Sequence, residues 1–376
     1  MTATDEQRLA RAYLVRVAEP PAPALVAFVR RHGPVVAAEL VRAGECPGRV
    51  GDETAARREL DLAERDLAEA DGLGARLVIP EDDEWPEWTL QALRIAGDRG
   101  VREAALPLAL WVSGERRLDE AATGAVAIVG ARAATGYGEH TAAEFGFGLG
   151  SRDIPVFSGA AYGIDGAAHR GALASEGFTA AVLGCGLDAG YPAGHVTLLN
   201  RIAERGLVIS EYPPGTPPGR HRFLVRNRLI AALTEGTVVV EAGLRSGARN
   251  TAGTAGTLGK VVMAVPGPIG SAASMGCHDL IREHHATLVT SVADIVETVG
   301  ELGAERSEPS RPRRPTDGLE PQAMRVHEAL SARSGKAAER LAAESGVPLG
   351  RVRAVLPELE MSGLVERCDA GWRRAG

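Results

Sequence analysis

AVAIVGARAATGYG, residues 125–138, is the stretch from which the fold can be predicted. A short apolar run ends at a Gly-Ala turn, and a segment of helical composition follows. Six further apolar runs, rich in Val, Ile and Ala and bounded by Gly or Pro, repeat this pattern: IPVFSGA, TAAVLG, GLVISE, GTVVVEAG, KVVMAVPG and ATLVTS. Strands that are apolar on both faces are typical of a parallel sheet buried under helices. We therefore predict an α/β fold with a Rossmann-like, doubly wound, mostly parallel sheet.

The rest of the chain predicts three further parts. Residues 1–74 have helical patterns broken by Pro and Gly, including one long amphipathic run from Thr54 to Ala70, and predict a small helical domain. The extended Rossmann-like domain then covers residues 75–300; its first part, residues 76–122, is mixed and ends with a strand-like LPLALWVSG at residues 106–114. Residues 301–318 contain three Pro and almost no apolar side chain, which is typical of a linker. Residues 319–376 show three short helical segments and a two-strand ending, the pattern of a winged-helix domain.

Composition is that of an ordinary soluble globular protein. The 376 residues are 45% hydrophobic and 24% charged, and no apolar run is long enough for a transmembrane helix. The first residues carry acids and lack the apolar core of a secretory signal, so we expect a cytoplasmic protein without a membrane partner. The net charge of −7 argues against a protein that coats nucleic acid everywhere, although a local basic groove can still bind phosphate.

Ligands of open α/β sheets bind at the carboxyl ends of strands, so the loops that follow strands are candidate sites. The first loop, GAR at residues 130–132, opens a helix, where small residues and the helix N-terminus favour an anion and the arginine adds donors. The second loop, SGAAYG at residues 158–163, offers a hydroxyl and a series of amides to a phosphate. The candidate residues in these two loops are Arg132, Ser158, Gly159 and Gly163.

Two further loops follow strands. LGCGLD, residues 183–188, looks like half of a dinucleotide fingerprint, but Tyr191-Pro192 displaces the helix that the fingerprint needs, so a nicotinamide cofactor is disfavoured. EAGLRSGARNT, residues 241–251, has two arginines, a serine and two glycines before a helix that we expect to begin near Asn250. This is a strong anion-site pattern. Its candidate residues are Arg245, Ser246 and Gly247.

One helical stretch is unusually basic. From Tyr212 to Thr234 there are four arginines, one histidine and no acid. Arg226, Asn227 and Arg228 lie inside this amphipathic helix. Exposed arginines on a helix are usually solvated, but the absence of an acid in this stretch favours phosphate contact. We predict that these three residues form a side wall of the binding site.

The sequence shows no catalytic set. No HExxH, no P-loop and no lysine in any of these loops is present, and no Ser/His/Asp order stands out. The four cysteines lie far apart and suggest neither a zinc ribbon nor a disulfide framework. Several anion loops without a nucleophile or a metal cluster indicate binding to a polyanion rather than turnover, with no cofactor.

At these residues the chain resembles the DNA-processing protein A family (DprA, also called Smf). The matching strings include IVGARAATGYG, FSGAAYGIDGAAHRGAL, FLVRNRLIAAL and VVVEAGLRSGARNTA, in family order over about residues 125–297. The resemblance implies a Rossmann-like core that binds single-stranded DNA, dimerises and loads the RecA recombinase in natural transformation. It also implies a SAM-like helical N-terminus and a winged-helix tail. The family's DNA-binding positions correspond here to Arg132, Ser158, Gly159, Gly163, Arg226, Asn227, Arg228, Arg245, Ser246 and Gly247.

Two rival functions stay open at this stage. Nucleotide phosphoribohydrolases that resemble lysine decarboxylases share a Rossmann-like core and carry PGGxGTxxE; here the comparable residues 243–256 lack that acid, and Glu241 precedes them. A winged-helix tail also suits a transcription regulator, but acids follow Arg351 and Arg353 in its recognition helix. Aromatic residues are only 4% of the chain, which favours phosphate-dominated binding over base stacking. The aromatic residues nearest the loops are Tyr137, Tyr162 and Phe223.

Overall fold

The computed structural model describes residues 4–300, 316 and 318–375. The chain forms two compact units, residues 1–304 and 305–376. Most of the predicted linker, residues 301–318, lies outside the described residues. None of the described helices combines the length and the apolar content needed to cross a membrane.

The first unit is built on one nine-stranded sheet, in the order β1-β2-β6-β5-β4-β3-β7-β8-β9. All seven predicted apolar runs form strands, and they pair in parallel with one another, which confirms the mostly parallel, Rossmann-like fold. These strands are β3 (Val126–Val129), β4 (Val156–Ser158), β5 (Thr179–Leu183), β6 (Leu207–Ser210), β7 (Gly236–Val239), β8 (Val261–Ala264) and β9 (Thr287–Leu288). Beyond β6, β2 (Leu110–Ser113) and β1 (Ala75–Val78) extend the sheet in antiparallel fashion.

The strand order reverses between β3 and β7. From β3 the chain adds β4, β5 and β6 on one side, and it then returns to place β7 against the other side of β3. In doubly wound sheets, ligands bind in the crevice at the carboxyl ends of the strands where the order reverses. The loops after β3 and β7, which carry Arg132 and Arg245, therefore face the same crevice.

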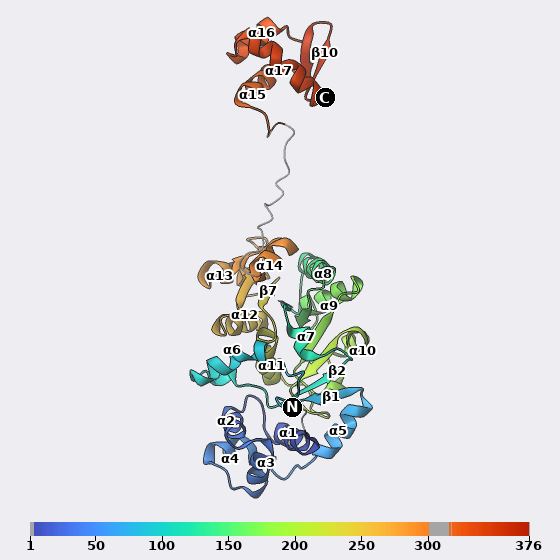
Figure 1. The fold of residues 1–376 in the computed structure, drawn as a ribbon, viewed down its shortest axis with the longest axis vertical. Coiled ribbons are helices and arrows are strands. Elements are labelled where there is room, and N and C mark those ends of the chain that lie inside the picture. The colour runs from blue at the N-terminus through green and yellow to red at the C-terminus, as the bar shows by residue number, and fades with distance from the viewer. Residues whose placement is uncertain (1–3, 301–315, 317, 376) are drawn as a thin grey trace. The chain divides into compact units, whose positions relative to one another are not determined.

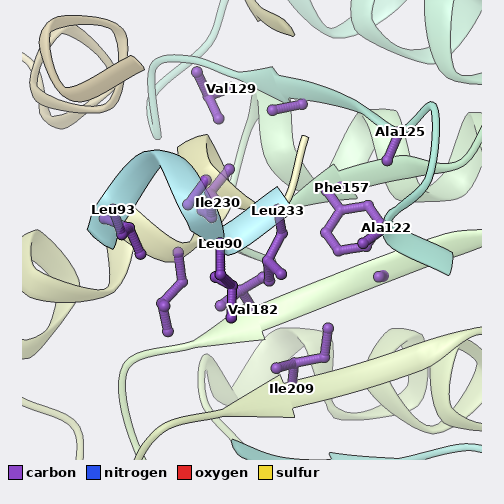
Figure 2. Close-up of a cluster of buried hydrophobic side chains, with 14 of the residues drawn as sticks. Leu90, Leu93, Ala122, Ala125, Val129, Phe157, Val182, Ile209, Ile230 and Leu233 are labelled. Atoms are coloured by element: carbon purple, nitrogen blue, oxygen red, sulfur yellow. The ribbon is translucent and has the colours of Figure 1, made fainter. Parts of the chain in front are cut away.

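Helices cover both faces of this sheet (Figure 1). One apolar cluster holds α6 (Glu87–Asp98), α7 (Leu118–Ala122), α11 (Arg220–Ala232), α12 (Gly247–Thr257) and α13 (Met275–Glu283) on one face. Figure 2 shows Leu90 of α6 and Ile230 of α11 in this cluster, together with Phe157 of β4. Two other clusters hold the opposite face against α8 (Gly136–Gly150), α9 (Ile164–Ala174), α10 (Val196–Arg205) and α14 (Val292–Val299).

The N-terminal segment is helical, as predicted, but it belongs to the first compact unit. Its helices are α1 (Asp5–Val17), α2 (Pro23–His32), α3 (Pro34–Ala43), α4 (Gly48–Thr54) and α5 (Ala63–Gly72). Their apolar cluster continues onto Leu77, Ile79 and Trp111 at the edge of the sheet. The prediction of one long helix from Thr54 to Ala70 is wrong, because the chain turns between α4 and α5. The Arg58 carbonyl in this turn accepts a 2.9 Å hydrogen bond from the Tyr13 hydroxyl.

The second unit has the predicted winged-helix pattern. It contains α15 (Pro321–Ala329), α16 (Ala338–Ser345), α17 (Leu349–Met361) and a hairpin of β10 (Val365–Cys368) and β11 (Gly371–Arg374). Gly346 ends α16 with a left-handed φ of 67°, a conformation that favours glycine. On α17, the predicted recognition helix, Arg351 pairs with Glu320 and Arg353 pairs with Glu339. These pairs neutralise the basic residues that a duplex-binding helix would present.

Candidate nucleic-acid interface

A groove lies at the point where the strand order reverses. Its empty volume is about 1270 Å³. Four segments line it: the loop after β3, the second loop with the start of α9 (Ala161 and Asp165), α11, and the loop after β7 with the start of α12. The structure thus brings the first, second and fourth predicted loops together with the basic helix.

Three arginines make the groove positive. Arg132, Arg220 and Arg245 all line the groove and are all exposed. None of them forms an ion pair with any residue in the described part of the chain. An exposed, unpaired guanidinium can donate to a phosphate without giving up an internal partner. The groove is therefore suited to a polyanion.

The start of α12 adds backbone donors to the same groove. Ser246 is the N-cap of α12, and its hydroxyl accepts from the Arg249 amide, while Gly247 is the first residue of the helix. The helix thus begins before Asn250, where the sequence predicted its start. The first amides of a helix have no intrahelical acceptor and carry a partial positive charge. Since Ser246, Gly247 and Ala248 line the groove, these amides are available to an anion there.

An aromatic pocket opens beside the arginines. Tyr191 and Phe223 are stacked, with ring centroids 5.3 Å apart and planes 19° apart. The Arg132 guanidinium lies over the Phe223 ring, 5.1 Å from its centroid. Together with Tyr162 and Cys185, these residues line a cavity of about 360 Å³. Flat aromatic faces next to arginines are typical of sites that stack unpaired bases.

Two amides of the second loop already donate to an internal acceptor. The buried Asp165 carboxylate accepts from the amides of Gly159 and Ala161, at 3.1 and 3.4 Å. Burial raises the pKa of this carboxyl, and the charge of Arg226 and the loop amides oppose the rise. An internal carboxylate therefore occupies the place where the sequence analysis put a phosphate.

A buried carboxylate also holds the N-cap residue of α8, the helix whose N-terminus was predicted to favour an anion. Glu241, which follows β7, is 2% exposed. Its carboxylate accepts from the Thr135 amide at 2.9 Å and from the Thr135 hydroxyl at 2.6 Å. A Cβ on Gly138 would lie only 2.3 Å from this carboxylate, so the helix needs glycine there. Glu241 thus fixes the loop that carries Arg132.

The candidate residues of the second loop, Ser158, Gly159 and Gly163, have structural roles in the packing around the loop. The Ser158 side chain is fully buried and donates to the Ile128 carbonyl at 2.6 Å, so it is closed to a phosphate. A Cβ on Gly159 would lie 2.5 Å from the Arg226 guanidinium. Gly163 has a φ of 74°, and a Cβ there would lie 2.3 Å from the Ala131 carbonyl oxygen. Ser158, Gly159 and Gly163 thus have structural roles, and the phosphate contacts predicted for this loop stay a prediction that these internal contacts disfavour.

Arg226 and Asn227 lie on the floor of the groove. Arg226 is 5% exposed and donates to the Gly159 carbonyl at 2.9 Å and to the Val182 carbonyl. It lines both the groove and the aromatic pocket. Asn227 donates to the Asn250 side chain at 3.1 Å and so joins α11 to the start of α12. Both residues are buried beneath the groove surface that the exposed arginines line.

Arg228 is absent from the groove lining, so its predicted phosphate contact stays a prediction that its buried ion pair disfavours. The guanidinium is 3% exposed and donates to both oxygens of the buried Glu211, at 2.6 and 2.8 Å. Burial raises the pKa of the Glu211 carboxyl, and the charge and hydrogen bonds of Arg228 oppose the rise. Glu211 precedes the acid-free stretch by one residue, so the charge count over residues 212–234 did not include the acid that pairs with Arg228.

Sequence reasoning did not single out Arg220 and Tyr191. Arg220 belongs to the basic stretch, but only its position in the first turn of α11 shows that it faces the groove. Tyr191 precedes Pro192 in the third loop, and its stacking on Phe223 joins residues that are far apart in sequence. Among the described residues, no group of three His, Cys, Asp or Glu side chains could hold a metal ion.

Comparison with known proteins identifies the family. The family model of DNA recombination-mediator protein A matches residues 76–300, and the DprA winged helix domain model matches residues 310–371. The chain belongs to the DNA-processing protein A (DprA) family. The DprA domain contains the whole groove, whereas α1 to α5 precede the matched residues.

Individual DprA relatives agree with this. The DNA processing protein DprA of Mycobacterium tuberculosis is 52% identical over 374 residues, which cover 99% of this chain and 96% of the relative. The protein Smf of Escherichia coli is 37% identical over 71% of this chain and 72% of its own length. The X-ray structure of DprA from Streptococcus pneumoniae is similar with a TM-score of 0.62 and 30% identity, over 79% of this chain and 98% of that chain.

Proposed function

We propose that this protein binds single-stranded DNA in the groove between the β3 and β7 loops. The observation that carries the proposal is the meeting of three unpaired arginines with the stacked pair of Tyr191 and Phe223. Arginines contact phosphates of any sequence, and aromatic faces stack on bases. Base faces are free in a single strand, whereas a duplex keeps them covered. Membership of a family of DNA recombination mediators supports DNA as the polyanion.

In this proposal the contacts come from fewer loops than the sequence analysis expected. Arg132, Arg220 and Arg245 bind phosphates, and the first amides of α12 at Gly247 bind one more. Phe223 and its aromatic neighbours stack on a base. The second loop, with Asp165 inside it, shapes the groove without touching phosphate.

Fluorescence anisotropy with labelled oligonucleotides tests the proposal. Since the groove has several phosphate contacts, affinity should climb steeply with single-strand length up to several nucleotides and then level off. Binding should fall as salt rises, because each phosphate contact releases counterions. A duplex of the same length should bind more weakly. If the duplex binds as tightly as the single strand at every salt concentration, the aromatic pocket is not a base site.

The same site supports binding rather than nucleotide hydrolysis. A hydrolase needs a carboxylate free to act on a nucleotide or a water, and the two carboxylates beside this groove, Asp165 and Glu241, are engaged in loop hydrogen bonds. Incubation with nucleoside monophosphates should therefore release no base, and AMP should displace a bound oligonucleotide poorly. Release of base, or displacement by AMP at comparable concentration, would instead favour an enzyme.

We further propose that the protein passes its DNA to the RecA recombinase and works as a cytoplasmic homodimer. These points follow from family membership. RecA assembly on single-stranded DNA, measured with and without this protein, tests the first, and sedimentation across a concentration range tests the second. RecA assembly that does not respond to the protein, or a monomer at all concentrations, would contradict them.

A further inference from the structure

The N-terminal helices meet the first turn of α11, which leads into the groove, through the carboxylate of Glu19. Glu19 lies in the connection between α1 and α2. Its carboxylate accepts from Arg222 Nε at 2.7 Å and from the second Arg222 nitrogen at 3.1 Å. It also contacts Arg57 at 2.6 Å and His221 at 3.1 Å. The Glu19 carboxylate thus contacts three basic side chains, and two of them belong to α11.

The two α11 residues lie at an unfavourable place in that helix. Arg220, His221 and Arg222 form its first turn, which contains no acid, and the N-cap Gly219 provides no side-chain hydrogen bond. Positive side chains at a helix N-terminus face the positive end of the helix dipole, whereas acids there are stabilising. Glu19, in the connection between α1 and α2, supplies the negative charge that the first turn of α11 lacks.

The Glu19 carboxyl is stabilised in its charged form. Burial raises the pKa of this carboxyl, but hydrogen bonds from its basic neighbours outweigh burial and hold the pKa at about 2. A second bridge runs nearby: Arg16 of α1 donates to the Pro214 carbonyl at 2.7 Å, in the segment that leads into α11. The N-terminal helices therefore hold both the first turn of α11 and the chain before it.

That turn is continuous with the groove. Phe223, which carries the aromatic stack, follows Arg222 directly, and Arg220 and Leu224 line the groove on either side. The Phe223 ring is closely packed against Gly184, because a Cβ on that glycine would lie 2.8 Å from the ring. A small rotation or fraying of this turn would move Phe223 out of the stack and Arg220 away from the phosphates.

We propose that Glu19 is a positioning residue for DNA binding, through which the N-terminal helices hold the first turn of α11 and with it Phe223 and Arg220. The effect on DNA rests on the proposed function of the groove. The effect on α11 does not, because it concerns the free protein.

The test uses the full chain and three variants. Glu19→Gln keeps the shape and removes the charge, and Glu19→Asp keeps the charge. Glu59→Gln is the control, since Glu59, like Glu19, lies in a connection between N-terminal helices, here between α4 and α5, and its pair with Arg58 is exposed. Hydrogen exchange in a peptide covering residues 220–226 is measured without DNA, and single-strand affinity is measured at a temperature well below unfolding of every variant.

Glu19→Gln should speed exchange in residues 220–226 and weaken single-strand binding, each by about three- to tenfold, as expected for a residue that acts through a packed network. Glu19→Asp should restore most of both effects, and Glu59→Gln should change neither. Unchanged exchange in α11 would overturn the proposal. Faster exchange with wild-type affinity would also overturn it, provided that Arg132→Ala weakens binding in the same assay. If Arg132→Ala binds normally too, the groove assignment fails instead, and exchange alone decides the role of Glu19.

Discussion

Arg132 and Arg228 are both arginines, but one is exposed and the other is buried. Arg132 lies over Phe223 with its guanidinium exposed in the groove, whereas Arg228 is enclosed with Glu211. Substitution of the two residues should therefore affect different properties of the protein.

Arg132→Ala should weaken single-strand binding for every sequence and lower the slope of log affinity against log salt by about one, because one phosphate contact is lost. The melting temperature should hardly change, since an exposed arginine adds little to the core. Titrations at several salt concentrations measure the slope. Arg201→Ala, on the exposed side of α10, is the control and should bind normally. An Arg132→Ala protein with unchanged affinity at low and moderate salt would refute the contact.

Arg228→Ala should destabilise the fold by about 3–5 kcal/mol, because it leaves the buried Glu211 charge without its partner. Urea unfolding measures the loss. Replacing both residues together, as Arg228→Met with Glu211→Leu, should cost much less than Arg228→Ala alone. The folded fraction of each variant should retain single-strand affinity. Loss of affinity without loss of stability would return Arg228 to the binding site.

The sequence predicts which loop arginines line the groove better than which arginines of α11 do. Arg132 and Arg245 follow strands, and topology alone brings such loops to one edge of the sheet. Arg226 and Arg228 look the same in the sequence as Arg220. What separates them is the turn of helix on which each lies and the position of Glu211 after folding, and neither is visible in a count of nearby charges.

At the scale of elements, the contact between α8 and α9 depends on glycine. A Cβ on Gly146 of α8 would lie 2.3 Å from the Ala168 carbonyl oxygen of α9.

The sequence predicts the seven parallel strands because segments that are apolar on both faces are typical of strands buried between helices. It does not predict the turn between α4 and α5, which depends on the hydroxyl of Tyr13 in a distant helix.

Gly146→Ala should therefore destabilise the protein by about 1–3 kcal/mol through overpacking, although alanine is normally the better helix former. Gly253→Ala in α12 is the matched control, because its Cβ would meet no atom within 4 Å. That control should be neutral or gain about 0.4–1 kcal/mol. Thermal and urea unfolding of both variants measure the difference. Equal stability of the two would show that α8 and α9 can separate without cost.

At the scale of the whole molecule, the two compact units should divide the work. A chain ending at residue 304 keeps the groove, Glu19 and the entire sheet, so it should fold and bind single-stranded DNA with near-native affinity. The isolated unit from residue 305 should bind duplex DNA weakly, because Arg351 and Arg353 are paired with acids. Anisotropy with both DNA forms measures this. Loss of most single-strand binding on truncation would move the main contact to the winged helix.

The carboxylates of Asp165 and Glu241 also affect how fast and at what thermodynamic cost a strand binds. Because they hold the first and second loops by internal hydrogen bonds, we expect these two walls of the groove to keep their shape when a strand binds. The protein should then lose little conformational entropy on binding, and most of the entropy loss should come from the flexible strand. Association should be limited by encounter rather than by loop rearrangement, so the basic groove can steer a passing single strand at a rate set by diffusion and ionic strength.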